Sequence, residues 1–256
     1  MSNASMSPAS SLVTRLLGVG VTAAIAVATI VLAVTGNLAL YINPDGAWFA
    51  IAMAVLALVG CVASFAIPLG REAEHDHDHG DATQKPGRRI AGTVAAAVGG
   101  TIAVVVVAAA LVLPPASLSA QTAMDRDLGV TPLFGGDDVI ALATTGDTAT
   151  FGVGDWASVF ATAPDSRLYE GTTVTLTGFV TPSKADGAMQ LTRLVVTHCV
   201  IDAQPASIPL VELASGPETG QWVSVDGIVE ANANGALVVR TTSVTPIDEP
   251  ADPYEY

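Results

Sequence analysis

Three long apolar runs constrain this chain more than any other feature of its sequence. The first contains the uncharged stretch LLGVGVTAAIAVATIVLAVTGNLALYI. The second and third contain WFAIAMAVLALVGCVASFAIPLG and IAGTVAAAVGGTIAVVVVAAALVL, which are also uncharged. An α-helix needs about 20 consecutive apolar residues to cross a bilayer. We therefore expect a transmembrane domain over residues 1–115, with three spans at about 16–42, 48–69 and 90–113.

The composition agrees with membrane segments. Only 13% of the residues are charged and 50% are hydrophobic, whereas soluble domains carry about 25% charged residues. Between the first two runs, the turn-forming residues NPDG predict a tight connection and hence a helical hairpin. Tyr41 and Trp48 flank this turn, as aromatic residues do at a lipid–water boundary. A cleaved signal peptide is the alternative for the first run, but its apolar part is too long and no cleavage site follows it.

Basic residues near the ends of the spans predict the orientation. Arg15 precedes the first span, whereas the hairpin turn has no basic residue. The loop 71–89 between the second and third spans carries four, namely Arg71, Lys85, Arg88 and Arg89. Because Lys and Arg accumulate on the cytoplasmic side of a membrane, the N-terminus and this loop are expected in the cytoplasm. An odd number of spans then places everything after residue 115 outside the cell membrane.

The third run contains a stripe of small residues. Gly92, Ala96 and Gly100 recur every four residues and therefore share one face of a helix. Small residues let a neighbouring membrane helix approach closely enough for van der Waals packing. We expect this stripe to be a helix-packing surface; the alternative is a chance spacing in an alanine-rich segment.

The second half of the chain is strongly acidic. From residue 116 onward it has 18 acidic side chains against 5 basic ones, a formal charge of −13, whereas the first 115 residues have 6 and 5. Nucleic-acid binding requires a basic surface, so nucleic acid is not expected as a partner. The only cysteines are Cys61 and Cys199, which cannot form a disulfide framework.

Two segments are expected before the strands of this acidic half begin. Residues 116–154 are rich in Gly, Thr, Ala and Asp and predict an extracytoplasmic stalk. The stretch GDWASVFATAP then predicts a short helix, whose N-terminus Asp155 can cap. Both lie outside the cell in the expected topology.

Strand patterns fill the rest of the chain. Five β-like runs separated by turn residues cover residues 173–181, 189–199, 207–213, 222–232 and 236–247. Gly178 and Gly227 interrupt two of them, at places where small barrels bend or bulge. Asn234-Gly235 predicts a hairpin between the last two. We expect an OB-like five-stranded barrel over residues 155–256, with a five-stranded sandwich as the alternative.

The loop EHDHDHGD is the first candidate metal site. His75, His77 and His79 alternate with aspartates, and imidazole with carboxylate suits zinc, copper or nickel. Residues two apart share a face of an extended chain, so the three rings can converge. This predicts a weak zinc-type site in the cytoplasm. The alternative is a solvated connector, since a loop without preformed geometry must be ordered by the metal itself.

The stretch THCVIDAQP is the second candidate. His198, Cys199 and Asp202 are metal-binding types within five residues, but neighbours on a strand point to opposite faces, so a shared ion needs a bulge or a strand end. The alternative is a buried structural cysteine beside a satisfied histidine. No motif provides a nucleophile with its base, a phosphate loop or paired carboxylates, and we therefore expect no enzyme activity.

The order of several motifs resembles the YcgQ-like family of bacterial membrane proteins. The matching stretches are NLALYINP, HDHDHG and LVLPPASLS, followed by YEGTTVTLTGFV, LTRLVVTHCVIDAQP, WVSVDGIVE and the terminal PYEY. The resemblance implies a multi-pass protein of the bacterial inner membrane, with a YcgR-type multi-span permease as its partner. Relatives have paired cysteines where this chain has His198-Cys199, which changes the chemistry available there.

These features together predict a non-enzymatic accessory subunit of a two-component permease. Its spans would contact lipid and the permease, and its extracytoplasmic β domain would bind cargo or a partner. The alternative function is a zinc-type membrane sensor or metal-handling protein that uses the histidine loop.

Overall fold

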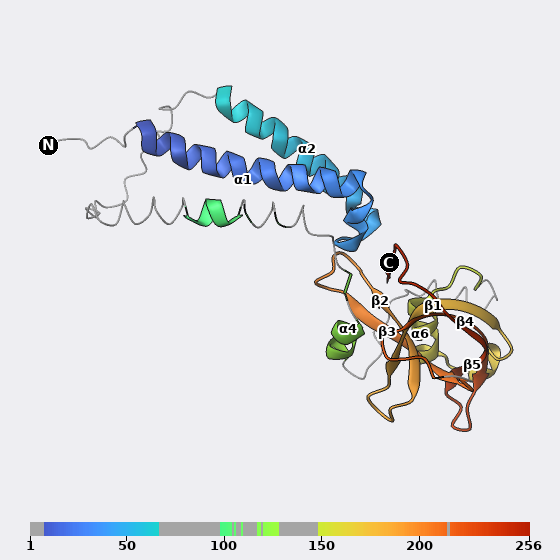
Figure 1. Cartoon of the computed structure of the whole chain (residues 1–256). Helices are drawn as coiled ribbons and strands as arrows, with labels where there is room; N and C mark the ends of the chain where they lie inside the picture. The colour runs from blue at the N-terminus through green and yellow to red at the C-terminus, as the bar shows by residue number, and fades with distance from the viewer. Residues whose placement is uncertain are drawn as a thin grey trace, which may run out of the picture. The chain divides into compact units, whose positions relative to one another are not determined.

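The computed structural model describes residues 8–66, 98–103, 105, 109, 117–118, 120–127, 148–213 and 216–256. The chain forms two compact units (Figure 1). The first holds Met1–Ala39 and Pro44–Pro115, and the second holds Leu40–Asn43 and Ala116–Tyr256. Nine residues connect the first two helices, and the last four of them, Leu40–Asn43, therefore belong to the unit that contains the β-strands.

Two helices form the predicted hairpin, but NPDG is not its tight turn, because Pro44, Asp45 and Gly46 form the first turn of the second helix. Helix α1 spans Pro8–Val34 and helix α2 spans Pro44–Ala66. They pack against each other, and the Cys61 thiol of α2 lies 3.7 Å from the Val19 carbonyl oxygen of α1. A short 3-10 turn, η1 (Asn37–Leu40), follows α1.

The expectation of three transmembrane helices is not supported by the described residues. Among them, one helix, Pro44–Phe65, is long and apolar enough to cross a membrane, and Gly18–Val34 is a shorter apolar segment. Most of the third predicted span lies outside the described residues. Apolar side chains of α2 are nevertheless well exposed, among them Trp48 at 70% and Val62 at 74%. Such a surface is typical of contact with lipid or with another protein.

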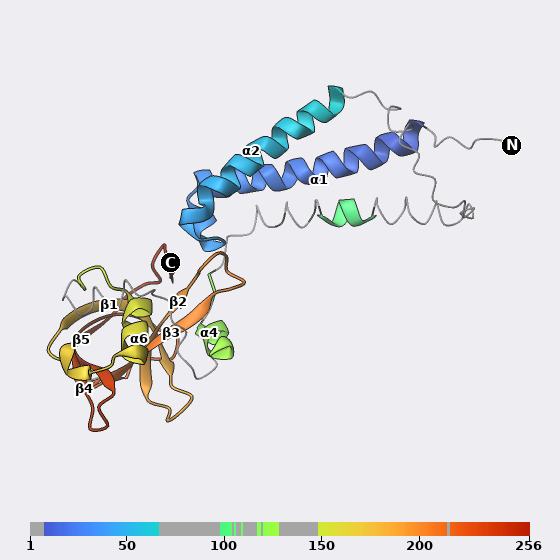
Figure 2. The ribbon, with the colours of Figure 1, turned by 180° about the vertical axis from the view of Figure 1, so that it is seen from behind.

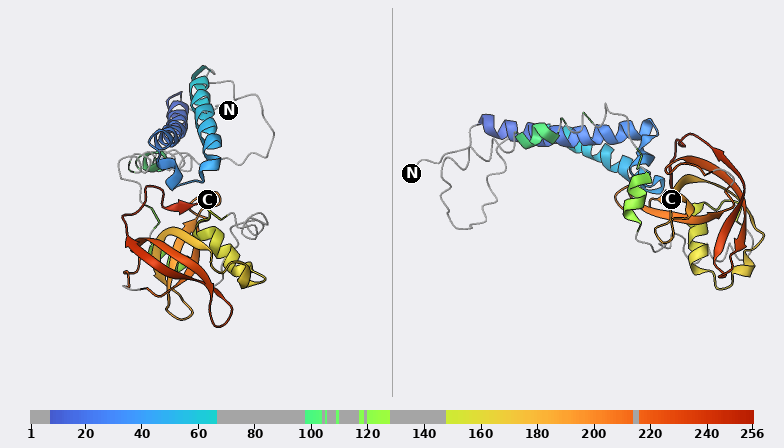
Figure 3. Two further views of the ribbon diagram at one scale, coloured as in Figure 1. Left: turned by 90° about the vertical axis from the view of Figure 1, so that its right-hand side faces the viewer. Right: turned by 60° about the horizontal axis from the view of Figure 1, so that its bottom comes forward.

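The second unit is built on a closed five-stranded barrel. Its strands are β1 (Thr173–Pro182), β2 (Met189–Val195), β3 (Gln204–Val211), β4 (Trp222–Ala231) and β5 (Leu237–Pro246), with a short β6 (Tyr254–Glu255) added beside β2. The sheet order β1-β4-β5-β3-β2 closes through the pairing of β1 with β2. Figure 3 shows the strands curving around this barrel. The closed barrel is consistent with the expected OB-like fold and excludes the alternative, a five-stranded sandwich.

Gly227 lies at an irregularity of its strand, as the sequence predicts, whereas Gly178 lies where two strands approach closely. The β4–β5 register shifts between Asp226 and Gly227, and a Cβ at Gly227 would lie 2.5 Å from Val239 Cγ1. A Cβ at Gly178 would lie 2.6 Å from the Thr192 carbonyl oxygen. Only glycine permits such close approach of two strands. At the β4–β5 turn, Gly235 has a φ of +80°, which confirms the predicted hairpin.

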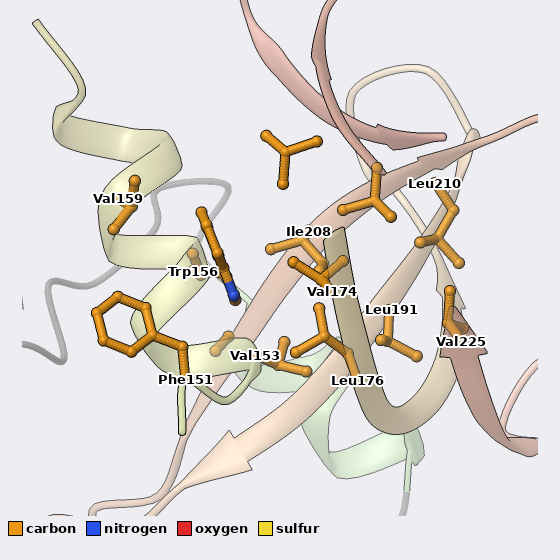
Figure 4. Close-up of a cluster of buried hydrophobic side chains, with 14 of the residues drawn as sticks. Phe151, Val153, Trp156, Val159, Val174, Leu176, Leu191, Ile208, Leu210 and Val225 are labelled. Atoms are coloured by element: carbon orange, nitrogen blue, oxygen red, sulfur yellow. The ribbon is translucent and has the colours of Figure 1, made fainter. Parts of the chain in front are cut away.

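Helix α6 (Val153–Thr162) packs against β2 and β3. Figure 2 shows it lying across the barrel, and Figure 4 shows Trp156 between this helix and Ile208. Trp156 is 1% exposed. The main core thus forms between this helix and the inner face of the barrel.

The start of α6 corrects one sequence expectation. The helix begins at Val153, so Asp155 lies in its first turn and is not its cap. Asp155 instead accepts a hydrogen bond from the Gly152 N–H at 3.1 Å. The N–H groups of Val153 and Gly154 donate to the carboxylate of Glu255, about 100 residues away, at 2.9 and 2.7 Å. The acceptor for the helix end comes from β6, which no local motif could indicate.

Candidate functional site

The loop between β2 and β3 is a compact turn around Asp202. The predicted strand 189–199 ends at Val195, so that expectation is wrong for its last four residues. The Asp202 carboxylate accepts hydrogen bonds from the backbone N–H groups of Thr197, His198 and Cys199 at 3.0 to 3.3 Å. Its own N–H donates to the Cys199 carbonyl at 2.9 Å. These bonds compete with strand pairing, because aspartate offers the backbone an alternative acceptor.

The segment Leu40–Asn43 joins this loop through an isolated β-bridge. Ile42 pairs with Cys199 in an antiparallel bridge. The Asn43 N–H donates to the His198 carbonyl at 2.9 Å, and the Val200 N–H donates to the Tyr41 carbonyl at 3.0 Å. Both contacts lie within the second unit. Residues that are more than 150 positions apart are therefore joined by backbone hydrogen bonds.

The Asn43 side chain reinforces the junction. Its Nδ2 donates to the carbonyl oxygens of Val196 at 3.2 Å and Thr197 at 3.0 Å. Asparagine can make both bonds because its amide carries two donor hydrogens. The sequence motif YINP thus supplies the residue that anchors the connecting segment, a role that its turn-forming residues alone do not indicate.

Helix α4 (Ala120–Arg126) fixes the other side of the loop. The Arg126 Nη1 donates to the carbonyl oxygens of Val200 at 3.0 Å and Ala203 at 2.8 Å. Two residues of the loop also belong to a second apolar cluster, which consists of Ala123, Phe179, Leu194, Val196, Ala203 and Tyr254. The loop is consequently held by backbone and side-chain contacts on both flanks.

Arg193 links the C-terminal segment to the barrel through hydrogen bonds. This side chain donates to the carbonyl oxygens of Thr177 (3.0 Å), Asp252 (2.6 Å), Pro253 (3.0 Å) and Tyr254 (3.2 Å). Its guanidinium lies over the Trp222 ring, 5.2 Å from the ring centre. Burial lowers the pKa of Arg193, and the Glu255 and Asp252 carboxylates oppose this effect. Sequence reasoning missed this residue, because a basic residue in a strand usually faces solvent.

Glu255 gives the barrel a pH-dependent contribution to stability. Burial raises the pKa of its carboxyl above the ordinary 4.5, although the N–H groups of Gly154 and Val153 act in the opposite direction. A raised folded-state pKa means that the contribution is complete below the unfolded pKa and is lost as pH rises through the folded one.

Glu255→Gln keeps the size of this side chain but removes its titration. The difference in free energy of unfolding between wild type and Glu255→Gln should therefore change with pH from 4.5 upward, in favour of the variant. Denaturant unfolding at several pH values measures it. A constant difference across that window would contradict the assignment.

The structure brings only some of the predicted site residues together. His198 and Asp202 are in contact, with Nδ1 3.2 Å from Oδ2, and the His198 side chain is 84% exposed. Cys199 is a free thiol in the same turn. In the part of the chain that the structure describes, no three His, Cys, Asp or Glu side chains form a group that could hold a metal ion. Both Asp202 oxygens already accept backbone hydrogen bonds, which reduces their availability to a cation.

The remaining predicted residues lie mostly beyond the described ranges. His75, His77 and His79 fall outside them, as do Gly92 and Ala96, whereas Gly100 lies in a described helical segment and is half-buried. Zinc binding by the histidine loop and helix packing by the small-residue stripe stay predictions.

The fold and its loop define a protein with an apolar helical hairpin whose connecting segment pairs with a closed β-barrel unit. Residues 20–128 match the DUF1980 N-terminal domain, and residues 155–256 match the DUF1980 C-terminal domain. The chain thus contains both DUF1980 domains in sequence. No curated protein matches the chain, and no solved structure matches it.

Proposed function

We propose that this chain is a three-span membrane protein whose β unit lies outside the cytoplasm and which serves a permease as an accessory subunit. One observation carries the topology: Ile42, between the two apolar helices, pairs with Cys199 of the barrel loop. Backbone hydrogen bonds require both segments to lie on the same side of a membrane. The hairpin turn and the β unit therefore share one compartment.

This pairing has a consequence for the number of spans. If α1 and α2 each cross the bilayer, the end of α2 lies on the side opposite the hairpin turn. The chain must then cross once more before residue 116 to bring the barrel back to the turn. The uncharged run 90–113 is the segment with the length and composition for that crossing. Given crossings by α1 and α2, the pairing thus supports a third span.

The distribution of basic residues orients this arrangement. Arg15 and the four basic residues of the loop 71–89 lie on one side, and the hairpin turn lies on the other. The positive-inside rule places the first side in the cytoplasm. The β unit is then extracytoplasmic, where a net charge of −13 favours solubility and disfavours nucleic acid.

A partner-binding role fits the surfaces better than catalysis. The exposed apolar side chains of α2 form a surface for lipid or another membrane protein. The resemblance to YcgQ-like proteins indicates that the partner is a YcgR-type permease of the same membrane, and the barrel would bind its cargo or cover its entrance. His198 and Asp202 are joined to each other but not to a nucleophile in the described residues.

The test is co-purification from detergent-extracted membranes, followed by mass spectrometry. We expect a multi-span permease to be recovered with the tagged chain, in the presence and absence of a metal chelator. Gly92→Ile with Gly100→Ile should reduce the recovery, whereas Gly99→Ile, one position off the stripe, serves as the matched control. The sensor function would be favoured instead by two results together: no permease is recovered, and the wild-type chain contains stoichiometric zinc that the His75/His77/His79→Ala variant lacks.

A further inference from the structure

Ile201 is the most exposed large apolar side chain among the described residues, at 84%. It lies in the turn of the β2–β3 loop and not in either apolar helix. A single exposed isoleucine in a mobile surface loop needs no explanation. Ile201 differs from such a residue because hydrogen bonds fix the backbone of the loop that carries it.

Contacts fix the backbone on both sides of Ile201. Before it, the Val200 N–H donates to Tyr41 and the Val200 carbonyl accepts from Arg126. After it, Asp202 accepts three backbone N–H groups of the same turn, and the Ala203 carbonyl accepts from Arg126. The turn thus presents an apolar side chain to solvent in a preformed conformation. A preformed loop loses little conformational entropy when it binds.

The connectivity places this turn at the membrane boundary. Val200 is hydrogen-bonded to Tyr41, and two residues after Tyr41 the chain enters α2 at Pro44. If α2 crosses the bilayer, its first turn lies at the outer lipid–water boundary. The turn with Ile201 is bonded to the segment that leads directly into that boundary, and the aromatic side chain of Tyr41 suits the same region.

We propose that the β2–β3 turn inserts Ile201 into the headgroup region of the outer leaflet and so holds the barrel against the membrane. This inference rests on the proposed topology. The interaction is hydrophobic, because the β unit has a net charge of −13 and is not attracted to anionic lipid. Binding should therefore be insensitive to salt, unlike that of a polybasic surface segment.

Tryptophan fluorescence of the full-length chain in lipid nanodiscs tests the proposal. Ile201→Trp is made in a Trp48→Phe background. Leu168→Trp in the same background is the control, since Leu168 is an apolar residue of the β unit, in the 3-10 turn Ser166–Leu168 before β1, and is 60% exposed. The nanodiscs contain phosphatidylcholine whose acyl chains are either plain or brominated near the headgroup. The emission added at position 201 should shift to the blue relative to the control and lose most of its intensity in brominated lipid, at low and high salt alike.

The native Trp48 separates this inference from the proposed topology. Quenching of Trp48 in the wild-type chain, without quenching at position 201, would overturn the insertion of the turn and leave the topology standing. Absence of quenching at both positions would overturn both. Equal quenching at positions 168 and 201 would contradict a specific role for the turn, because the whole barrel would then contact the lipid.

Discussion

Ile42→Cys is expected to form a disulfide with the native Cys199. The two residues face each other in an antiparallel bridge whose flanking hydrogen bonds, Asn43 to His198 and Val200 to Tyr41, make them a non-hydrogen-bonded pair. The Cα atoms of such a pair are about 4.5 Å apart, which lies within the range that a disulfide spans. Cys199 is free and partly exposed, and the proposed compartment is oxidising.

The effect of this cross-link should be large. It would close a loop of more than 150 residues, for which the chain-entropy model gives roughly 5 kcal/mol of stabilisation. A protease site placed in the loop 71–89 allows direct detection: after cleavage, the two fragments should stay joined on a gel until a reductant is added.

Two controls make the cross-linking experiment specific. Ile42→Cys combined with Cys199→Ser should not form the link, and neither should the wild-type chain, in which Cys61 is the other thiol. Fragments that separate without reductant in Ile42→Cys would contradict the pairing of the hairpin turn with the barrel.

Arg193→Ala is expected to destabilise the β unit by about 3–5 kcal/mol. Hydrogen bonds from a charged group contribute about 1.5–3 kcal/mol each, and this variant removes the donor from four carbonyl groups. The contributions of the four hydrogen bonds do not add up in full, because the carbonyls of the C-terminal segment can rehydrate once that segment detaches. Detachment of β6 would also remove Glu255 from the start of α6.

Denaturant unfolding of the full-length chain in nanodiscs, followed by the fluorescence of Trp156 and Trp222, measures this loss. Arg167→Ala is the matched control, since that arginine pairs with Asp165 on the surface and its side chain is 81% exposed. Exposed ion pairs contribute little, so the control should unfold like the wild type. Equal midpoints for Arg193→Ala and Arg167→Ala would refute the role given to Arg193.

The barrel was predictable from local patterns. Period-two alternation, the bend at Gly227 and the Asn234-Gly235 hairpin all depend on residues that are close in sequence, and each is present in the structure. Closure of the sheet follows from these elements, because a short, strongly bent sheet can pair its edges. The helical hairpin likewise follows from two apolar runs, although three of the four predicted turn residues lie in α2.

The candidate site was only partly predictable. The type and spacing of His198, Cys199 and Asp202 indicated a candidate metal site in this loop, but the strand was expected to continue through Cys199. The competing hydrogen bonds to Asp202 are local, since their donors lie three to five residues before it. An aspartate at that distance after a predicted strand is a signal that could have indicated them. The pairing of Leu40–Asn43 with this loop joins residues more than 150 positions apart, and no local pattern encodes such a contact.

The long-range contacts of the C-terminus were missed for the same reason. Glu255 caps a helix that begins at Val153, and Arg193 binds a segment about 60 residues further on. Each interaction depends on the parallel pairing of β6 with β2. Sequence periodicity predicts which face of a strand is buried. It does not predict which distant polar group forms hydrogen bonds with a polar side chain on that face.

A reporter enzyme that is active only in the cytosol, fused after Tyr256, gives the most direct measurement of the topology. A chain that crosses the bilayer an odd number of times from a cytoplasmic N-terminus should leave this fusion inactive, whereas a fusion within the loop 71–89 should be active. An active reporter after Tyr256 would place the barrel in the cytoplasm and contradict the proposed arrangement.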